Sequence, residues 1–316
     1  MLGSNIKFYR LKKGLTIRDL ASKINISPMA LSYYENNKRR PNKIVLSKIV
    51  ESLNINLTDL LTTYDTTSNN IINEDYLYNK ITKLEKEYID VQIIDYISRY
   101  FQILSFASLS NQLLIKKDEK VLEISQKAAN NASELRKYLQ INPIESINLI
   151  EALENNNIIL IPINFNGNYI ISTGKVNDIR YISYNINLSK EILYKHITYL
   201  LIEIFFNDIA KYEKKLIKDT YLEFLLPKKA LECIIKYQKT FNEELKSIQK
   251  KYSIPLKDYL YYLKREKIYS GNIDESISKS KVELPNRFSS ILNQIYTNNY
   301  IDERKYYELK KSNMLE

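Results

Sequence analysis

A closely spaced series of helix start and stop signals between Thr16 and Pro28 constrains this chain more than any other feature of its sequence. Thr16 and Asp19 have the spacing of a capping box, and the acidic side chain also suits the positive end of a helix dipole. Asn25 is the expected left-handed stop of this helix. Ser27 and Pro28 are then the N-cap and the first residue of the next helix, where the missing amide hydrogen of proline costs nothing. Two short helices separated by a tight turn are therefore expected here.

The flanking sequence predicts three further helices within residues 1–61. Ser4 is the expected N-cap of a first helix, and Gly14 can end it in the left-handed conformation that glycine adopts at little cost. A fourth helix is expected from Lys43 to Leu53, and Thr58 is expected to cap a short fifth helix. The segment is thus expected to form a five-helix domain.

The second helix and the third, which is expected to end at Glu35, form a helix-turn-helix unit with the small residue Ala21 where they cross. Apolar side chains fall at the positions that such a unit buries, namely Leu20, Ile24, Ile26, Leu31 and Tyr34. In this register the segment resembles the XRE/Cro-repressor-type family, through LTIRDLASKINISPMALSYYENNKRRPN and LSKIVESLNINLTDLL. The resemblance covers residues 1–61 and implies a lambda-repressor-like DNA-binding domain, in which Arg10 and Glu35 form a buried structural ion pair.

In that family the third helix lies in the major groove, where its N-terminal turn and its outward face meet base edges. The resemblance therefore implies base contacts from Ser27, Pro28, Met29, Ser32 and Tyr33. It implies phosphate contacts, which supply affinity rather than base choice, from Thr16, Asn37, Lys38, Arg39 and Arg40. The family often has glutamine at the first position of the second helix, but this chain has Ile17, which cannot hydrogen bond to DNA. Five-helix units of this kind also serve as protein-binding modules, and this alternative stays open.

The distribution of charge agrees with a basic N-terminal domain. The formal net charge is +10 at a sequence pI of about 9.2. Residues 1–61 carry eleven basic against four acidic side chains, a net of +7, which leaves +3 for the other 255 residues. A local excess of positive charge favours a nucleic-acid partner for this part of the chain.

Single counts of two residue types exclude several classes of metal site. Cys233 is the only cysteine, so it forms neither an internal disulfide nor a thiolate zinc cage. His196 is the only histidine and cannot supply the two-histidine site of a zinc protease. The sequence has no uninterrupted apolar run of about 18 residues and no apolar signal core at its start. A cytoplasmic protein without a membrane partner is therefore expected.

After the N-terminal domain, residues 62–72 read as a polar linker. Residues 73–124 read as a helical connector, within a helical stretch that continues to about residue 140, because apolar side chains recur at three- and four-residue spacing. The amphipathic segments at 73–115 are candidates for a dimer contact. A C-terminal helical extension is expected at 271–316.

Between these helical parts the sequence pattern changes from helical spacing to short β-branched runs. A helix started by Pro143 is expected, followed by short strands in IILIPINF, NYIIST and RYISYNI that are separated by turn residues. Residues 190–210 are again expected to be helical and very apolar. The sequence therefore predicts a chain that is mainly α with a small β-sheet.

The order of elements over residues 125–270 resembles the ImmA/IrrE-type metallopeptidase-like domain, through ASELRKYLQINPIESINLIEALENNNIILIPI, YKHITYLLIEIFF and EFLLPKKAL. The resemblance implies an α+β zincin-like fold. Active members carry HExxH, in which two histidines bind zinc and the glutamate activates water. Here His196 keeps the first position, but Ile197 and Leu200 replace the glutamate and the second histidine. A catalytically inactive pseudo-peptidase domain without metal or cofactor is expected, with His196 in the core or lining a pocket and Cys233 as a packing residue.

These features predict a bacterial or phage-type transcriptional regulator that binds double-stranded DNA, and whose inactive domain senses a small molecule, a peptide or a protein. The two-fold logic of such heads predicts a homodimer on a roughly palindromic operator. Three alternatives remain: a peptide-sensing helical-repeat regulator with the same head, an antitoxin-like partner protein, and an active metallopeptidase. A purely helical second half would favour the first, a co-purified neighbour protein the second, and stoichiometric zinc with proteolysis the third.

Overall fold

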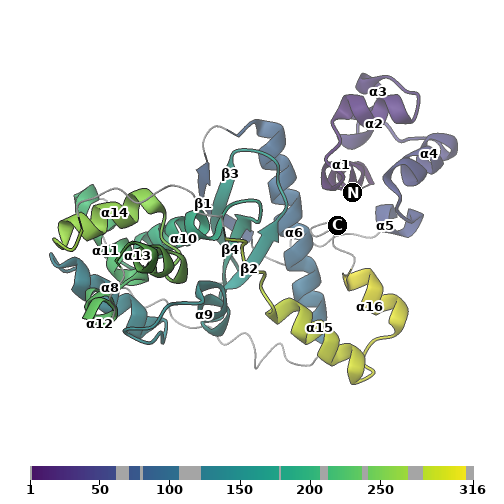
Figure 1. The fold of residues 1–316 in the computed structure, drawn as a ribbon. Helices are drawn as coiled ribbons and strands as arrows, with labels where there is room; N and C mark the ends of the chain where they lie inside the picture. The colour runs from purple at the N-terminus through teal and green to yellow at the C-terminus, as the bar shows by residue number, and fades with distance from the viewer. Residues whose placement is uncertain are drawn as a thin grey trace.

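The computed structural model describes residues 2–61, 71–78, 81–106, 122–177, 179–206, 213–236, 241–269 and 280–310. Within these ranges the chain is mostly helical and contains one small sheet, as the sequence predicts. Residues 2–61 form a helical head, and the described residues from 71 onwards form a body around the sheet (Figure 1). Head and body each have apolar cores of their own.

The head consists of α1 (Leu2–Lys12), α2 (Ile17–Lys23), α3 (Pro28–Glu35), α4 (Lys43–Leu53) and α5 (Leu57–Leu61). Local side chains set most of these bounds as predicted. Thr16 caps α2 in a capping box, and Ser27 caps α3 by accepting a hydrogen bond from the Ala30 amide. Gly14 and Asn25 adopt left-handed φ angles of 66° and 56° at the two stops. Four of the five predicted core side chains are buried, and Ile26 is half-buried.

Two expected caps in the head are wrong. The first helix starts at Leu2, and Ser4 lies inside it. The amide of Gly3 donates instead to the Asn37 side-chain oxygen at 2.9 Å, so the chain that follows α3 caps this helix. Thr58 likewise lies inside α5, which begins at Leu57.

The sheet contains β1 (Ile71–Tyr78), β2 (Ile159–Ile163), β3 (Tyr169–Val176) and β4 (Ile179–Asn185), in the order β1-β3-β4-β2. β3 pairs antiparallel with β1 and β4, and β2 pairs parallel with β4. The predicted strands β2, β3 and β4 are confirmed, and Pro162 is tolerated because β2 is an edge strand. The expectation of linker up to residue 72 and helix from residue 73 is wrong for β1, because backbone pairing with β3 takes up this segment.

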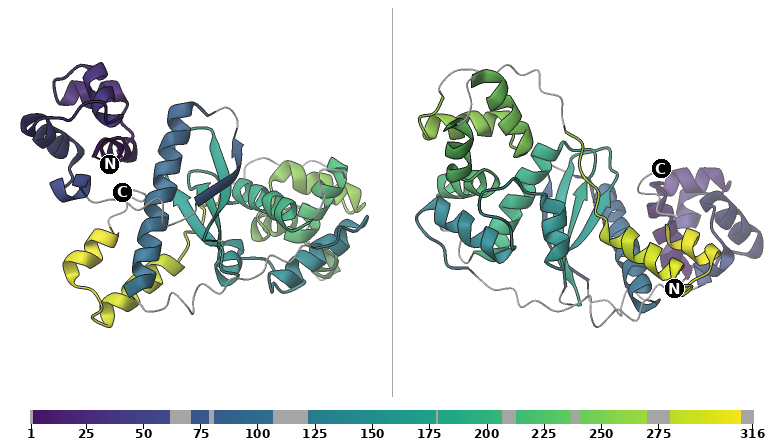
Figure 2. Two further views of the ribbon diagram at one scale, coloured as in Figure 1. Left: turned by 180° about the vertical axis from the view of Figure 1, so that it is seen from behind. Right: turned by 60° about the horizontal axis from the view of Figure 1, so that its bottom comes forward.

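Helices cover both faces of the sheet, so the strands have two apolar sides (Figures 1 and 2). On one face, α6 (Lys83–Phe106), α15 (Arg287–Thr297) and α16 (Glu303–Lys310) share a core with Ile159, Ile161 and Tyr181. On the other face, Leu160, Ile171 and Ile182 join a second core with the remaining helices. These are α8 (Ala128–Tyr138), α9 (Leu149–Asn155), α10 (Lys190–Phe205), α11 (Lys214–Leu225), α12 (Lys228–Lys236), α13 (Phe241–Lys251) and α14 (Leu256–Arg265).

Further differences concern the bounds of body helices. The helix expected at Pro143 begins at Leu149, where the Asn148 side chain accepts a hydrogen bond from the Glu151 amide. The helix expected over residues 190–210 is confirmed as far as Phe205, and residues 207–212 lie outside the described residues. Among the described helices, none is long and apolar enough to span a bilayer.

Candidate nucleic-acid interface

The recognition unit is held in place by an ion pair at the centre of the head. Arg10 Nε and Nη2 donate to the two carboxylate oxygens of Glu35 at 2.6 and 2.8 Å, and Arg10 Nη1 donates to the Leu15 carbonyl at 2.7 Å. Both side chains are buried, so the pair fixes α1 and the start of α2 against the end of α3. Such a bidentate pair gives a defined register to the elements that it joins. The predicted structural pair is therefore found.

The first turn of α2 carries the predicted phosphate contact at Thr16. Thr16 Oγ1 accepts from the Asp19 amide at 3.1 Å, and Asp19 Oδ2 accepts from the Thr16 amide at 2.8 Å. These hydrogen bonds with Thr16 lower the pKa of Asp19. The Thr16 hydroxyl keeps its own hydrogen and can still donate to an anion.

The outward face of α3 presents the predicted base-contact side chains to solvent. Met29 is 63% exposed and Tyr33 is 38% exposed, whereas Leu31 and Tyr34 on the same helix are buried. The Ser32 hydroxyl accepts a hydrogen bond from the Asn36 side chain at 3.3 Å. Ser27 and Pro28 lie exposed at the N-terminal end of the helix. The five predicted base-contact residues thus lie on the N-terminal end and outer face of one helix. This face presents both apolar and hydrogen-bonding side chains.

Three exposed cations follow α3 in the turn that leads to α4. Lys38, Arg39 and Arg40 are exposed, and no described residue pairs with their charged groups. The Lys38 and Arg39 amides donate to the Tyr33 carbonyl at 2.8 and 3.2 Å, which ties this turn to the end of α3. Asn37 has a different role from its neighbours, because its φ of 55° turns the chain and its oxygen caps α1.

Sequence reasoning did not nominate Arg18 or Lys43 as contacts. Both are exposed and lie at the starts of α2 and α4, near Thr16 and Arg40 respectively in the chain. Their position in a first helical turn beside a predicted contact is the signal that was available in the sequence. They add to the candidate phosphate contacts before and after α3 in the chain.

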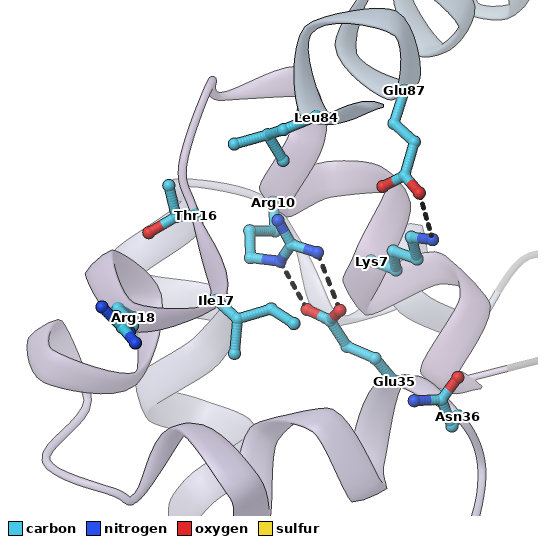
Figure 3. A pocket seen from close by; sticks show the side chains of 9 residues that line it. All are labelled: Lys7, Arg10, Thr16, Ile17, Arg18, Glu35, Asn36, Leu84 and Glu87. Atoms are coloured by element: carbon cyan, nitrogen blue, oxygen red, sulfur yellow. Dashed lines mark hydrogen bonds and ion pairs between the residues drawn. The ribbon is translucent and has the colours of Figure 1, made fainter. Parts of the chain in front are cut away.

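A cavity of about 400 Å³ lies between the head and α6 (Figure 3). Its head side is formed by Lys7, Arg10, Thr16, Ile17, Arg18, Glu35 and Asn36, and its body side by Leu84 and Glu87. Figure 3 shows the Glu87 carboxylate above Lys7, with which it forms an ion pair at 3.4 Å. The first turns of α6 therefore face the edge of the head that carries Thr16.

The body contains the degenerate HExxH segment on α10. Ile197 and Leu200 are buried at 0% and 3% exposure in the core of the body. His196 is half-buried; burial, and secondarily the neighbouring Lys195, lower its pKa. In the part of the chain that the structure describes, no three His, Cys, Asp or Glu side chains cluster as metal ligands would.

Arg136 joins two of the segments quoted from the sequence, and Cys233 differs from its expected role. Arg136 on α8 is buried and donates to the carbonyls of Phe224 at 2.8 Å and Leu225 at 3.4 Å, within the FLLP segment. Burial lowers the pKa of Arg136 to about 10, and the acceptors that it contacts here are uncharged backbone carbonyls. Cys233 is exposed, so its expected role in packing is wrong.

The capped five-helix head, with its turn between α2 and α3 and its exposed α3 face, is a helix-turn-helix domain of the XRE type. Residues 6–60 match the helix-turn-helix family. The chain is 41% identical over 56 residues to endothelial differentiation-related factor 1 of human, rat and mouse. This match covers 18% of the chain and 38% of those relatives' length.

One solved structure was also matched, the crystal structure of Bacillus thuringiensis PlcR in complex with the peptide PapR7 and DNA. The match covers 98% of this chain and 97% of that one, at 14% identity. Its TM-score is 0.19, which is too low to indicate a shared fold.

Proposed function

We propose that the chain is a transcriptional regulator whose head binds double-stranded DNA through α3. The observation that carries this proposal is the exposed face of α3 beside three cations without partners in the described part of the chain. Side chains on such a face meet base edges in the major groove, while flanking cations meet phosphates. Thr16, Arg18 and Lys43 extend the proposed phosphate contacts.

The test separates base contacts from phosphate contacts. Duplexes bound by the purified chain are selected from a randomised library and sequenced, for the wild type, Ser32→Ala, Tyr33→Ala and Arg39→Ala. Changes on the α3 face are expected to alter the selected sequence, because they remove base contacts. Arg39→Ala is expected to weaken binding while keeping the selected sequence. Equal loss at every sequence in the Ser32 and Tyr33 variants would contradict the assignment, and Ser22→Ala on the exposed side of α2 serves as the control.

We infer that the regulator acts as a homodimer on a roughly palindromic operator, since one α3 reads only a short half-site. A half-site pair separated by one helical turn is the expected binding unit. Light scattering of the protein with and without the selected duplex tests this point, because a monomer on a single half-site would contradict it.

We infer further that the body is a catalytically inactive relative of the ImmA/IrrE-type domain. Burial of Ile197 and Leu200 supports this inference, because these two positions would carry the base and the second ligand of a zinc protease. The test is zinc content together with hydrolysis of a denatured protein substrate. Stoichiometric zinc with hydrolysis that is lost in His196→Ala would overturn it.

The body is proposed to sense a small molecule, a peptide or a protein. A cavity of about 780 Å³ between head and body supports this proposal, since its volume is within the range of ligand pockets. It is lined by the end of α1 and the next turn, by Leu84, Glu85 and Tyr88 on α6, and by Phe165 with its neighbours. A ligand there would touch both parts and change the equilibrium between their arrangements. Thermal-shift screening, followed by DNA binding with each hit, tests the sensing role.

The helical-repeat alternative expects a purely helical second half. Strands β2, β3 and β4 disfavour it. The antitoxin-like alternative remains, and co-purification of a neighbouring gene product in the absence of DNA binding would favour it.

A further inference from the structure

One face of α6 touches the head. Leu84, Glu87, Tyr88, Gln92 and Asp95 recur at three- and four-residue spacing, so they form one stripe along the helix, which we call the α6 stripe. The opposite side of α6 packs on the sheet and α15 through residues such as Ile89, Ile93 and Tyr100. The α6 stripe therefore lies on the other side of the helix from the sheet, with Tyr88 at its edge also packed on Phe165 of the body.

Three polar contacts hold α1 on the α6 stripe. Lys12 Nζ lies 2.6 Å from Asp95 Oδ1, and Gln92 Nε2 donates to the Lys12 carbonyl at 3.2 Å. Lys7 pairs with Glu87 at 3.4 Å at the other end of the contact. The Asp95 side chain is only 4% exposed, and Arg99 Nε donates to its second oxygen at 3.1 Å. Lys12 thus completes a buried carboxylate site that is built by the body.

Apolar burial agrees with this contact. Leu11 on α1 and Val91 on α6 are 3% and 7% exposed, although neither belongs to the main apolar core of its own part. This is expected of side chains that the contact between α1 and α6 covers. The surface combines acidic groups with apolar groups and faces the basic helix α1.

The position of α6 bears on the proposed DNA site. Its first turns, with Leu84 and Glu87, line the same cavity as Thr16 and Arg18 at the start of α2 (Figure 3). A duplex whose backbone passes Thr16 would have to enter the space beside the Glu87 carboxylate. Negative charge and the volume of α6 therefore oppose a phosphate at this edge, whereas the outer face of α3 stays open.

We propose that the α6 stripe is an internal docking surface for the basic head, and that docking on it competes with DNA. The inference rests on the proposed DNA binding and adds a regulatory state to it. DNA then binds a head that has left the α6 stripe, and the apparent affinity is lowered by the fraction of heads that stay docked. The α6 stripe and the DNA backbone are both negatively charged, and both would bind the same basic edge of the head.

Cross-linking tests the competition directly in the full chain. A zero-length carbodiimide joins lysine to carboxylate only where they pair, so Lys7 to Glu87 and Lys12 to Asp95 are the expected products without DNA. Their yields are measured by mass spectrometry with and without a saturating pool of random-sequence duplex at low salt. Fluorescence anisotropy on the same samples reports the fraction of protein bound to DNA.

We expect the yield of both cross-links to fall in proportion to the bound fraction. Equal yields with DNA bound would overturn the competition, and absence of both products without DNA would overturn docking itself. A flat anisotropy titration would instead refute the proposed DNA binding, so the two failures are distinguishable.

A pair of variants gives a second readout. Glu87→Gln removes one contact on the half-exposed edge of the surface, and Glu134→Gln removes the same charge from an exposed site on α8, across the sheet from the head (Figure 1). Glu87→Gln is expected to bind duplex more tightly than the control, and Asp95→Asn, if melting shows it folded, more tightly still. Complete loss of docking is expected to raise the DNA affinity by a factor within the roughly 5- to 150-fold range of ordinary coupling between sites. A Glu87→Gln affinity equal to that of the control would overturn the proposal.

Discussion

Removal of Arg39 or Arg40 gives the most direct quantitative test of the DNA interface. Each exposed cation that neutralises one phosphate contributes about 0.9 to the slope of log affinity against log salt on B-DNA. Lys38, Arg39 and Arg40 have no described partners, so together they should contribute about 2.7 per head. Arg40→Ala should therefore lower the slope by about 0.9 per head, and by about 1.8 in a complex with two heads.

The same relation gives the loss of affinity. Since the counterion contribution vanishes near 1 M salt, one lost contact lowers the affinity by about 0.9 decades at about 0.1 M, which is roughly eightfold per head. The assay is anisotropy of a labelled random-sequence duplex over a series of salt concentrations. Lys229→Ala on α12 removes the same charge from an exposed site in the body and is the control. If Arg40→Ala changes the slope no more than this control does, the basic run is a solvated loop.

Three further predictions concern the stability of the chain. Arg10→Met leaves the Glu35 carboxylate buried without a partner and should destabilise the head by about 3–5 kcal/mol, as measured by urea denaturation and hydrogen exchange. Gly3→Ala places a Cβ 2.1 Å from a backbone carbonyl at the end of α3 and should cost about 1–3 kcal/mol, while Ser4→Ala on the exposed side should change little. Burial lowers the pKa of His196 in the folded state, so its contribution to stability is complete above about pH 6.5 and is lost as the pH falls through the lower folded pKa. An imidazole NMR titration that gives a pKa above 6.5, or a pH dependence of stability that persists unchanged in His196→Gln, would contradict this reasoning.

The head was predictable to the residue where a helix is defined by its own neighbours. Ser27 and Pro28 start α3 as predicted, and α4 has its predicted bounds, with Asn42 as a cap that the sequence analysis did not name. The start of α1 was missed because its cap comes from Asn37, 34 residues away from Gly3. Local patterns contain no information on such a contact, since it exists only after α1 has packed on α3.

The same limit explains the error in the body. β1 pairs with β3, which follows about a hundred residues later, and its own sequence IINEDYLY lies between a polar stretch and a helical one. The exposure of Cys233 was missed because the apolar neighbours of a residue do not determine which side of a helix faces the core. The individual base and phosphate candidates were accessible from sequence, but the position of Thr16 beside α6 was not.

The position of the head beside α6 affects how its positive charge acts on DNA. The net of +7 in residues 1–61 attracts DNA, but part of it is already matched by the acids of the α6 stripe. Salt weakens both interactions, because it screens the half-exposed pair between Lys7 and Glu87 as well as phosphate contacts. Raising the salt concentration therefore frees more heads while it weakens each complex, and the two effects oppose one another. If docking competes with DNA, the salt dependence of the full chain must be shallower than that of Glu87→Gln, in which less docking remains to be lost.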